Sequence, residues 1–198
     1  MSLRNYLEKL TNDQKIRKIS QPISKTYEIA AVLKQLEPTP VLFESVRESP
    51  FRVVGNLFCS KADFADYFDL PVSLIIPRLT RAIEKHSPCP QVKQAPCQEV
   101  VDLQPDLDNL PILRHCEKDG GNYISSGVVI AKHPRYGQNA DFHRGMQFSG
   151  REMALRIVRN RHFDTFLRDL KEIDVAICIG NSPNVLAAAA TSVEIGVD

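Results

Sequence analysis

Apolar positions in the first forty residues predict a helix, a short strand and a second helix. Between Leu3 and Leu10 they recur every three or four residues, which is the period of an amphipathic helix. A short strand is expected over 15–19. The second helix should present an apolar face over 29–36 and end before the two prolines at 38–40.

The next segment predicts a pair of neighbouring strands followed by a capped helix. Residues 41–46 and 51–55 are short apolar runs joined by the turn sequence Glu-Ser-Pro. Ser60, followed three residues later by Asp63, is a capping signal for a helix. The first part of the chain is therefore expected to be an α/β unit.

A cluster of prolines divides the chain into two predicted domains. Three prolines lie within 88–96 and favour extended backbone, so we place a linker over 87–97. The prediction is an N-terminal α/β domain over 1–96 and a second domain over 97–198.

The second part predicts a hairpin, two helices and a final unit of strand, turn and helix. A strand rich in β-branched residues should end near Ile130, and a hairpin connects it to a return strand over 139–148. Two helices are expected next, split near Asn160. The segment 174–179 resembles a buried strand, and Ser182 should cap the helix that follows it.

Composition argues against several classes of protein. Lysine and arginine number 25 and aspartate and glutamate 24, so no net field marks a nucleic-acid or anionic-membrane partner. No apolar run approaches the roughly 18 residues of a membrane span, and no signal-like segment follows Met1, so we expect a cytoplasmic protein. The five cysteines contain no C-x-x-C pair, which argues against a disulfide framework or a zinc ribbon.

The most suggestive polar residues lie on the predicted return strand, with His162 further along the chain. On a regular strand Asn139, Asp141 and His143 share one face, whereas Arg144 points the other way. An isolated histidine is more often a structural residue than a ligand. Spacing alone therefore leaves both a metal site and a structural role open.

Five motifs in a fixed order carry a resemblance to a known family. They are Asp106-Leu-Asp-Asn-Leu-Pro-Ile, Asp119-Gly-Gly-Asn-Tyr-Ile-Ser-Ser-Gly, Gln138-Asn-x4-Arg144, Arg161-His162 and Ile179-Gly-Asn-Ser-Pro183. In their order and intervals the chain resembles the UbiD family of decarboxylases, but only about the first half of a member. The resemblance implies an α+β fold: an N-terminal α/β domain, then a partial split β-barrel of the flavin-reductase-like type that binds prenylated FMN.

The resemblance also implies which residues form the site. Asn139 and His162 match ligands of a divalent ion, Mn²⁺ or Mg²⁺, that bridges to the flavin phosphate; the third ligand, a glutamate, is expected directly after Asp198. Ser125 matches a potassium site. Arg144 matches the arginine beside the substrate carboxylate and is the implied catalytic residue. The other implied cofactor-binding residues are Ala140, Asp141, Phe142, Arg161, Ala189, Ala190 and Thr191.

The implied activity is the non-oxidative removal of CO₂ from an aromatic or α,β-unsaturated carboxylic acid, with anhydromevalonate phosphate and a polyprenyl-hydroxybenzoate as candidate substrates. Implied partners are a flavin prenyltransferase, a polypeptide that supplies the missing C-terminal half, and further copies in a homo-oligomer. Alone, the chain is expected to be inactive because it lacks the catalytic glutamates. The alternative is a non-catalytic module that binds flavin or a partner through an open barrel with unpaired edges.

Overall fold

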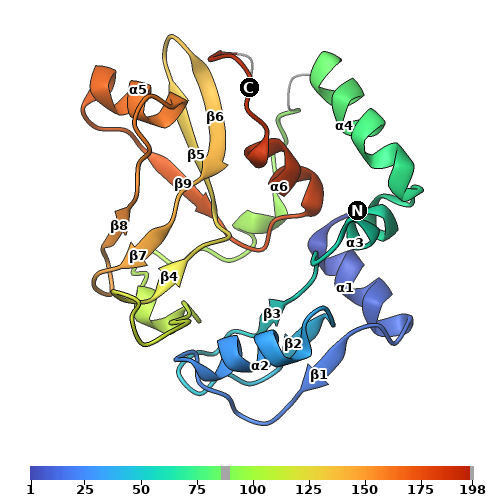
Figure 1. Ribbon diagram of the computed structural model, residues 1–198. Helices are drawn as coiled ribbons and strands as arrows, with labels where there is room; N and C mark the ends of the chain where they lie inside the picture. The colour runs from blue at the N-terminus through green and yellow to red at the C-terminus, as the bar shows by residue number, and fades with distance from the viewer. Residues whose placement is uncertain (86–89, 197–198) are drawn as a thin grey trace.

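The computed structural model describes residues 1–85 and 90–196, and within them the chain is a mixed α/β fold on three three-stranded sheets (Figure 1). One sheet belongs to the first part of the chain and two belong to the second. The predicted linker over 87–97 lies partly outside the described residues.

The first part forms a small sheet with helices packed around it. Its elements are α1 (Leu3–Asn12), β1 (Arg17–Ile19), α2 (Glu28–Leu36), β2 (Val41–Phe43), β3 (Val53–Gly55), α3 (Lys61–Phe68) and α4 (Ile75–Glu84). The central strand β2 runs parallel to β1 and antiparallel to β3. Ile29 of α2 is fully buried against Val41 and Phe43 of β2, which fixes that helix on the sheet. The sequence pattern predicts all these elements except α4.

The second part contains two antiparallel sheets and two helices. Its elements are β4 (Tyr123–Ile124), β5 (Val128–His133), β6 (Gly137–Phe142), β7 (Gly145–Gln147), β8 (Met153–Leu155), α5 (His162–Leu170), β9 (Val175–Cys178) and α6 (Pro183–Ala190). The strand orders are β4-β7-β8 and β6-β5-β9. In the part of the chain that the structure describes these sheets form no closed barrel, so the mixed α/β class is confirmed and the barrel is not.

The return strand predicted over 139–148 is wrong as a single strand. β6 ends at Phe142, and β7 begins at Gly145 in the other sheet, so residues 143–144 cross between the sheets. At the start of β7, Gly145 packs closely on β8: an added Cβ would lie 2.8 Å from Cε of Met153, the flexible end of that side chain, and 3.2 Å from Cδ2 of Leu155.

The first of the two helices predicted around Asn160 is also wrong, because that segment forms β8. Met153 and Leu155 are half-buried whereas Ala154 between them is exposed, which is the two-residue period of a strand. Pairing with β7 selects this conformation. The second predicted helix is present as α5.

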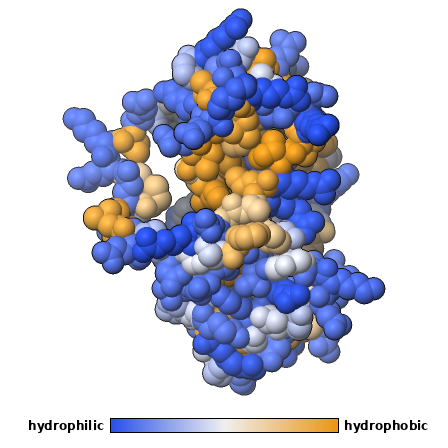
Figure 2. All heavy atoms as spheres, turned by 90° about the vertical axis from the view of Figure 1, so that its left-hand side faces the viewer, coloured by the Kyte–Doolittle hydropathy of each residue, from blue (hydrophilic) through white to orange (hydrophobic). Residues whose placement is uncertain are grey.

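The strand predicted over 174–179 forms as β9, but it is not buried. Val175 is 40% exposed and Ile179 is 57% exposed. Within the described residues β9 pairs only with β5, so it is an edge strand. Figure 2 shows apolar side chains gathered on the side of the molecule where Figure 1 has α5, β8 and β9.

Two expectations from composition can be compared with the fold. No helix in the described ranges is long and apolar enough to cross a membrane. The cysteines that the structure describes, Cys59, Cys97, Cys116 and Cys178, are free thiols.

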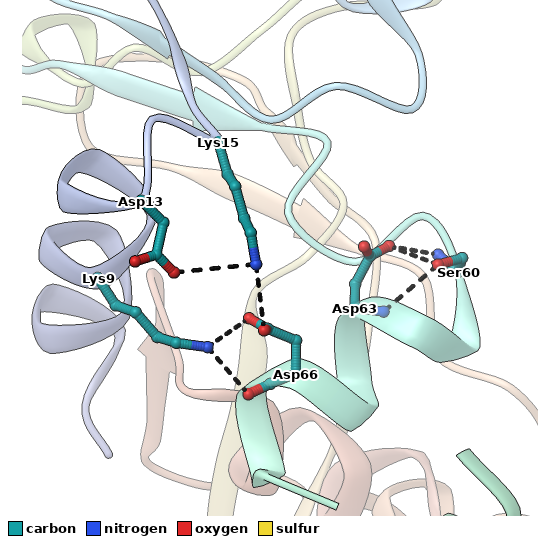
Figure 3. Close-up of polar contacts among 6 residues, drawn as sticks. All are labelled: Lys9, Asp13, Lys15, Ser60, Asp63 and Asp66. Atoms are coloured by element: carbon teal, nitrogen blue, oxygen red, sulfur yellow. Dashed lines mark hydrogen bonds and ion pairs between the residues drawn. The ribbon is translucent and has the colours of Figure 1, made fainter. Parts of the chain in front are cut away.

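The capping signal before α3 is confirmed. The Asp63 backbone N–H donates to Oγ of Ser60 at 3.3 Å, and the Ser60 backbone N–H donates to Oδ2 of Asp63 at 2.7 Å (Figure 3). This reciprocal pair satisfies two of the donors that the start of a helix leaves open.

Helices α1 and α3 are joined by aromatic contacts and ion pairs. The buried rings of Tyr6 and Tyr67 meet edge to face, with centroids 5.2 Å apart. Beside them, Asp66 accepts hydrogen bonds from Lys9 at 2.7 Å and Lys15 at 3.4 Å (Figure 3). The hydrogen bond from Lys9 lowers the pKa of Asp66, although partial burial opposes the shift.

Replacing Asp66 by Asn should lower the free energy of unfolding by on the order of 0.5–1 kcal/mol at neutral pH, because two ammonium groups lose their carboxylate. Since the folded-state pKa of Asp66 is depressed, this contribution is present above the ordinary value of 3.8 and is lost as the pH falls through the folded-state pKa. Urea unfolding of wild type and Asp66→Asn should differ at pH 7 and converge in acid. Glu8→Gln, an exposed change on α1, is the control, and identical curves at pH 7 would contradict the prediction.

Candidate functional site

Strand β6 is the element on which the candidate site is built. Asn139 pairs with Ala131 of β5, and Asp141 pairs with Val129. Because Ala131 and Val129 are buried against α5, Asn139 and Asp141 lie on the face that α5 covers. Ala140 and Phe142 point to the opposite face, where α6 contacts this strand (Figure 1).

Asn139 and His162 meet at the start of α5. His162 is the first residue of that helix, and its Nδ1 lies 3.2 Å from Oδ1 of Asn139. Asn139 is 3% exposed, and its Nδ2 has no hydrogen-bond partner among the described residues. The expectation that these two groups converge therefore agrees with the geometry, whereas their metal-binding role stays a prediction.

The donor types at this point suit a hard or borderline divalent cation. An amide oxygen and an imidazole nitrogen are ligands found with Mg²⁺ and Mn²⁺. The amide of Asn139 can rotate by 180° with little change of shape, so its oxygen can face the position that Nδ2 now faces. Within the described ranges no group of three or more His, Cys, Asp or Glu side chains could hold a metal, so a cation here would need ligands from elsewhere.

His143 and Asp141 form a buried pair on the same side of β6. Nε2 of His143 lies 2.8 Å from Oδ1 of Asp141, and its Nδ1 lies 3.2 Å from the carbonyl oxygen of Arg156. Burial lowers the pKa of His143, but the carboxylate of Asp141 beside its ring outweighs this effect, so the pKa is raised. The carboxylate beside Nε2 stabilises the protonated form of the ring, and in that form the contact with Asp141 is an ion pair.

Arg144 points away from this group, as the alternation along the strand predicts. Its side chain is exposed, and its guanidinium carbon lies 4.5 Å from the centre of the Tyr123 ring. This is a cation–π contact, which restricts where the guanidinium can lie. The catalytic role of Arg144 remains a prediction.

A cleft of about 670 Å³ lies beside Tyr123, between the first and second parts of the chain. Its walls come from β3, β4, the loop after β4 and the turn before α6, and include Phe51, Val54, Phe58, Tyr123, Ser125 and Ile179. Its volume is that of a small-molecule site. Ser125 is exposed in this wall, on a different segment from Asn139 and His162.

The remaining predicted cofactor residues lie at two helix ends. Arg161 is exposed and immediately precedes α5. Ala189 is buried near the end of α6, Ala190 is exposed, and the Thr191 hydroxyl donates to the carbonyl of Ala187 at 2.7 Å. Because α6 contacts β6, the structure brings this helix beside the strand that carries Asn139.

His133 is a second buried histidine. The sequence pattern identified it only as part of a turn. Its Nδ1 accepts from the backbone N–H groups of Arg135 and Tyr136, and its Nε2 donates to Oδ2 of Asp169 at 3.0 Å. The ring packs 5.0 Å from that of Phe166. These contacts fix the β5–β6 turn, which is a structural role. A histidine directly before Pro in a turn was the available signal.

Asn139→Leu should leave the free energy of unfolding unchanged or slightly higher. The change removes a buried amide nitrogen that has no partner, which should raise the free energy of unfolding by about 1–3 kcal/mol. It also removes the hydrogen bond to His162, which should lower that free energy by about 1 kcal/mol. Asn181→Leu is the control, because Nδ2 of Asn181 donates to the carbonyl of Cys178 at 2.7 Å, and this variant should lose about 1 kcal/mol. Chemical denaturation measures both. A loss above about 2 kcal/mol in Asn139→Leu would show that Asn139 serves the fold.

Two family models match almost the whole chain. Residues 7–83 match the model UbiD_N, the 3-octaprenyl-4-hydroxybenzoate carboxy-lyase N-terminal domain. Residues 90–198 match the model UbiD, the 3-octaprenyl-4-hydroxybenzoate carboxy-lyase Rift-related domain.

Relatives of known name are similar over the full chain. The anhydromevalonate phosphate decarboxylase of Methanothermobacter thermautotrophicus is 32% identical over 201 residues, which cover 99% of this chain and 46% of that protein. The enzyme of the same name from Methanosarcina mazei is 32% identical over 202 residues, again 99% of this chain and 46% of the relative. The chain therefore spans about half the length of these relatives.

Solved structures also match almost the whole chain, which again covers a little under half of each of them. The UbiD-class enzyme HmfF from Pelotomaculum thermopropionicum, in complex with FMN, matches with a TM-score of 0.94 and 30% identity, over 100% of this chain and 46% of that one. Vanillic acid decarboxylase from Sedimentibacter hydroxybenzoicus, in closed form, matches with a TM-score of 0.87 and 25% identity, over 98% and 45%. The described elements are thus arranged as in chains about twice as long.

Proposed function

The chain belongs to the UbiD family, and from that premise we propose that it forms the N-terminal half of a decarboxylase that uses prenylated FMN. The substrate would be an aromatic or α,β-unsaturated carboxylic acid, and the named relatives favour anhydromevalonate phosphate over a polyprenyl-hydroxybenzoate. The observation that carries the proposal is the 3.2 Å approach of Asn139 to His162, at the two positions where the family resemblance expects metal ligands.

Asn139 and His162 would hold Mn²⁺ or Mg²⁺, which would supply positive charge for binding the cofactor's phosphate. The residues fit this use because they offer oxygen and nitrogen donors in a buried place, and one end of the Asn139 amide has no partner among the described residues. A potassium ion near Ser125 belongs to the same proposal. The other proposed cofactor contacts are Ala140, Asp141, Phe142, Arg161, Ala189, Ala190 and Thr191.

Arg144 would bind the substrate carboxylate. Its guanidinium is permanently charged and can donate two parallel hydrogen bonds to a carboxylate, which fixes the direction of the C–CO₂ bond. The Tyr123 ring, 4.5 Å away, limits the freedom of the guanidinium before substrate arrives. Prenylated FMN, when bound, supplies the sink for the electrons that CO₂ leaves behind. The chain contributes orientation of the carboxylate and exclusion of water.

The rest of the active enzyme would be a region equivalent to the second half of the relatives, either a C-terminal half of the same protein or a partner subunit. More than half of each relative's length has no counterpart in this chain. The exposed edge strand β9 and the apolar face in Figure 2 would receive that half, which would close the split β-barrel and supply the catalytic glutamates. A flavin prenyltransferase would provide the cofactor, and the assembled enzyme would be a homo-oligomer.

A second candidate function is a non-catalytic module that binds flavin. It is favoured by the lack, within the described residues, of a metal-binding group with three His, Cys, Asp or Glu side chains. Flavin binding without turnover, even when the second half is present, would support this candidate.

Mixing the chain with the downstream half of a relative, prenylated FMN and Mn²⁺ should restore CO₂ release. Arg144→Ala should lower kcat/KM by about 100-fold or more, because the carboxylate is no longer oriented. Arg151→Ala, a change of another exposed arginine, is the matched control and should keep full activity. Wild-type turnover that survives Arg144→Ala would contradict the role of this residue.

Metal binding provides an independent test of Asn139 and His162. In the presence of FMN, Asn139→Ala and His162→Ala should each weaken Mn²⁺ binding by about 10-fold or more, because each change removes one ligand. Electron paramagnetic resonance of free Mn²⁺ gives the affinity. The exposed residue His115 offers the control His115→Ala, which should bind as wild type. Equal affinities in all four proteins would rule out this metal site.

A further inference from the structure

The buried histidine on the crossing between the two sheets, His143, connects three parts of the candidate site. It follows β6 directly, its ring lies 4.8 Å from that of Phe163 on α5, and its Nδ1 faces the carbonyl of Arg156 after β8. Its neighbour Arg144 is tied to the same place, because the Arg156 backbone N–H donates to the carbonyl of Arg144 at 3.0 Å. The crossing is therefore fixed to the end of β8 from both sides.

Protonation of both ring nitrogens makes these contacts compatible. Nδ1 needs a proton to donate to the carbonyl of Arg156, and Nε2 faces a carboxylate oxygen of Asp141 at 2.8 Å. Nε2 and that oxygen lie at hydrogen-bond distance but without good hydrogen-bond geometry, and neither has another partner among the described residues, so the contact between them is mainly electrostatic. The raised pKa of His143 agrees with this arrangement.

We propose that His143 and Asp141 are positioning residues, whose ion pair fixes the crossing so that Arg144 lies on Tyr123 while Asn139 faces His162. This inference rests on the proposed function of Arg144 and Asn139. The crossing carries the chain from the last proposed cofactor contact on β6 to the proposed carboxylate ligand within two residues. A change of its path by even 1 Å would move the guanidinium relative to the metal site.

The molecule offers a matched control for a purely structural role. His133, at the far end of β5, is also buried, also meets a carboxylate, in Asp169 at 3.0 Å, and also packs against a phenylalanine of α5. It lies at the β5–β6 turn and not at the crossing. Substitution of either histidine removes a buried ring and its contact with a carboxylate, but only His143 adjoins Arg144.

The first measurement follows the Arg144 side chain directly in the 198-residue chain. The ring current of Tyr123 should shift the Nε–Hε signal of Arg144 in an ¹H–¹⁵N spectrum, because the guanidinium lies 4.5 Å from the ring centre. In His143→Gln and in the isosteric variant Asp141→Asn this signal should move to the position of a free arginine. In His133→Gln it should stay where the wild type has it.

The second measurement uses the chain together with the downstream half, prenylated FMN and Mn²⁺. His143→Gln should lower kcat/KM by about 10-fold or more, mainly through a higher KM for the carboxylate substrate, whereas His133→Gln should not. An unchanged Arg144 signal and an unchanged KM in both His143→Gln and Asp141→Asn would overturn the inference. Failure of these two variants to fold, while His133→Gln folds, would also overturn it, because the pair would then support the whole domain.

The two proposals can fail separately. A wild-type mixture without Mn²⁺ binding or turnover would refute the proposed function, yet the comparison of the Arg144 signal would still test the positioning role. A working wild-type enzyme whose His143→Gln variant keeps both signal and KM would refute only the positioning role.

Discussion

The antiparallel pairing of β5 with β6 is the interaction on which the site depends. Its register sets Asn139 opposite Ala131 and Asp141 opposite Val129, and so turns both polar side chains toward α5. A slip of one residue would send them to the face of α6 and bring Ala140 and Phe142 in their place. The buried His133, which ties the turn between the two strands to α5, stabilises this register.

The polar side chains that α5 covers on β6 and the crossing contribute little to the stability of the fold. Burying an amide nitrogen without a partner costs free energy, and a buried ion pair seldom gains more than it loses in desolvation. Asn139, Asp141 and His143 nevertheless lie within five residues of one another, beside the start of a helix and a crossing between sheets. Several buried polar groups that lower stability are thus gathered in one short segment. Such a cluster is typical of a functional site, where the geometry of the side chains matters more than stability, and both proposals rest on this reasoning.

The first half of the family fold has its own cores even though it lacks the second half. One core unites α2 with β2, another unites β5 with α5, and a third joins α1 to α3 through Tyr6 and Tyr67. Some apolar side chains remain exposed outside these cores, among them Val175 of β9. The TM-score of 0.94 to a chain about twice as long means that the elements of this chain are arranged as in that longer protein. A second half could therefore pack against them in the same way.

The sequence by itself determined the local elements whose signals are short-range. The helical spacing from Leu3 to Leu10, the Ser60 and Asp63 cap and the start of α6 at Pro183 appear where the pattern placed them. The Ser182 side chain, however, does not make the capping hydrogen bond that the pattern predicts. The order of the motifs was sufficient to identify the family, and the two-residue period of a strand was sufficient to separate Arg144 from Asn139.

Only the tertiary structure decided what depends on pairing partners distant in the chain. Residues 153–155 became a strand because β7 lies beside them, and the return strand broke after Phe142 because its continuation joins a second sheet. β9 is an edge strand because it pairs with β5 alone among the described residues. The ion pair of Asp141 with His143 exists because the crossing brings the ring back over the strand, and a one-dimensional pattern contains no information about such a bend.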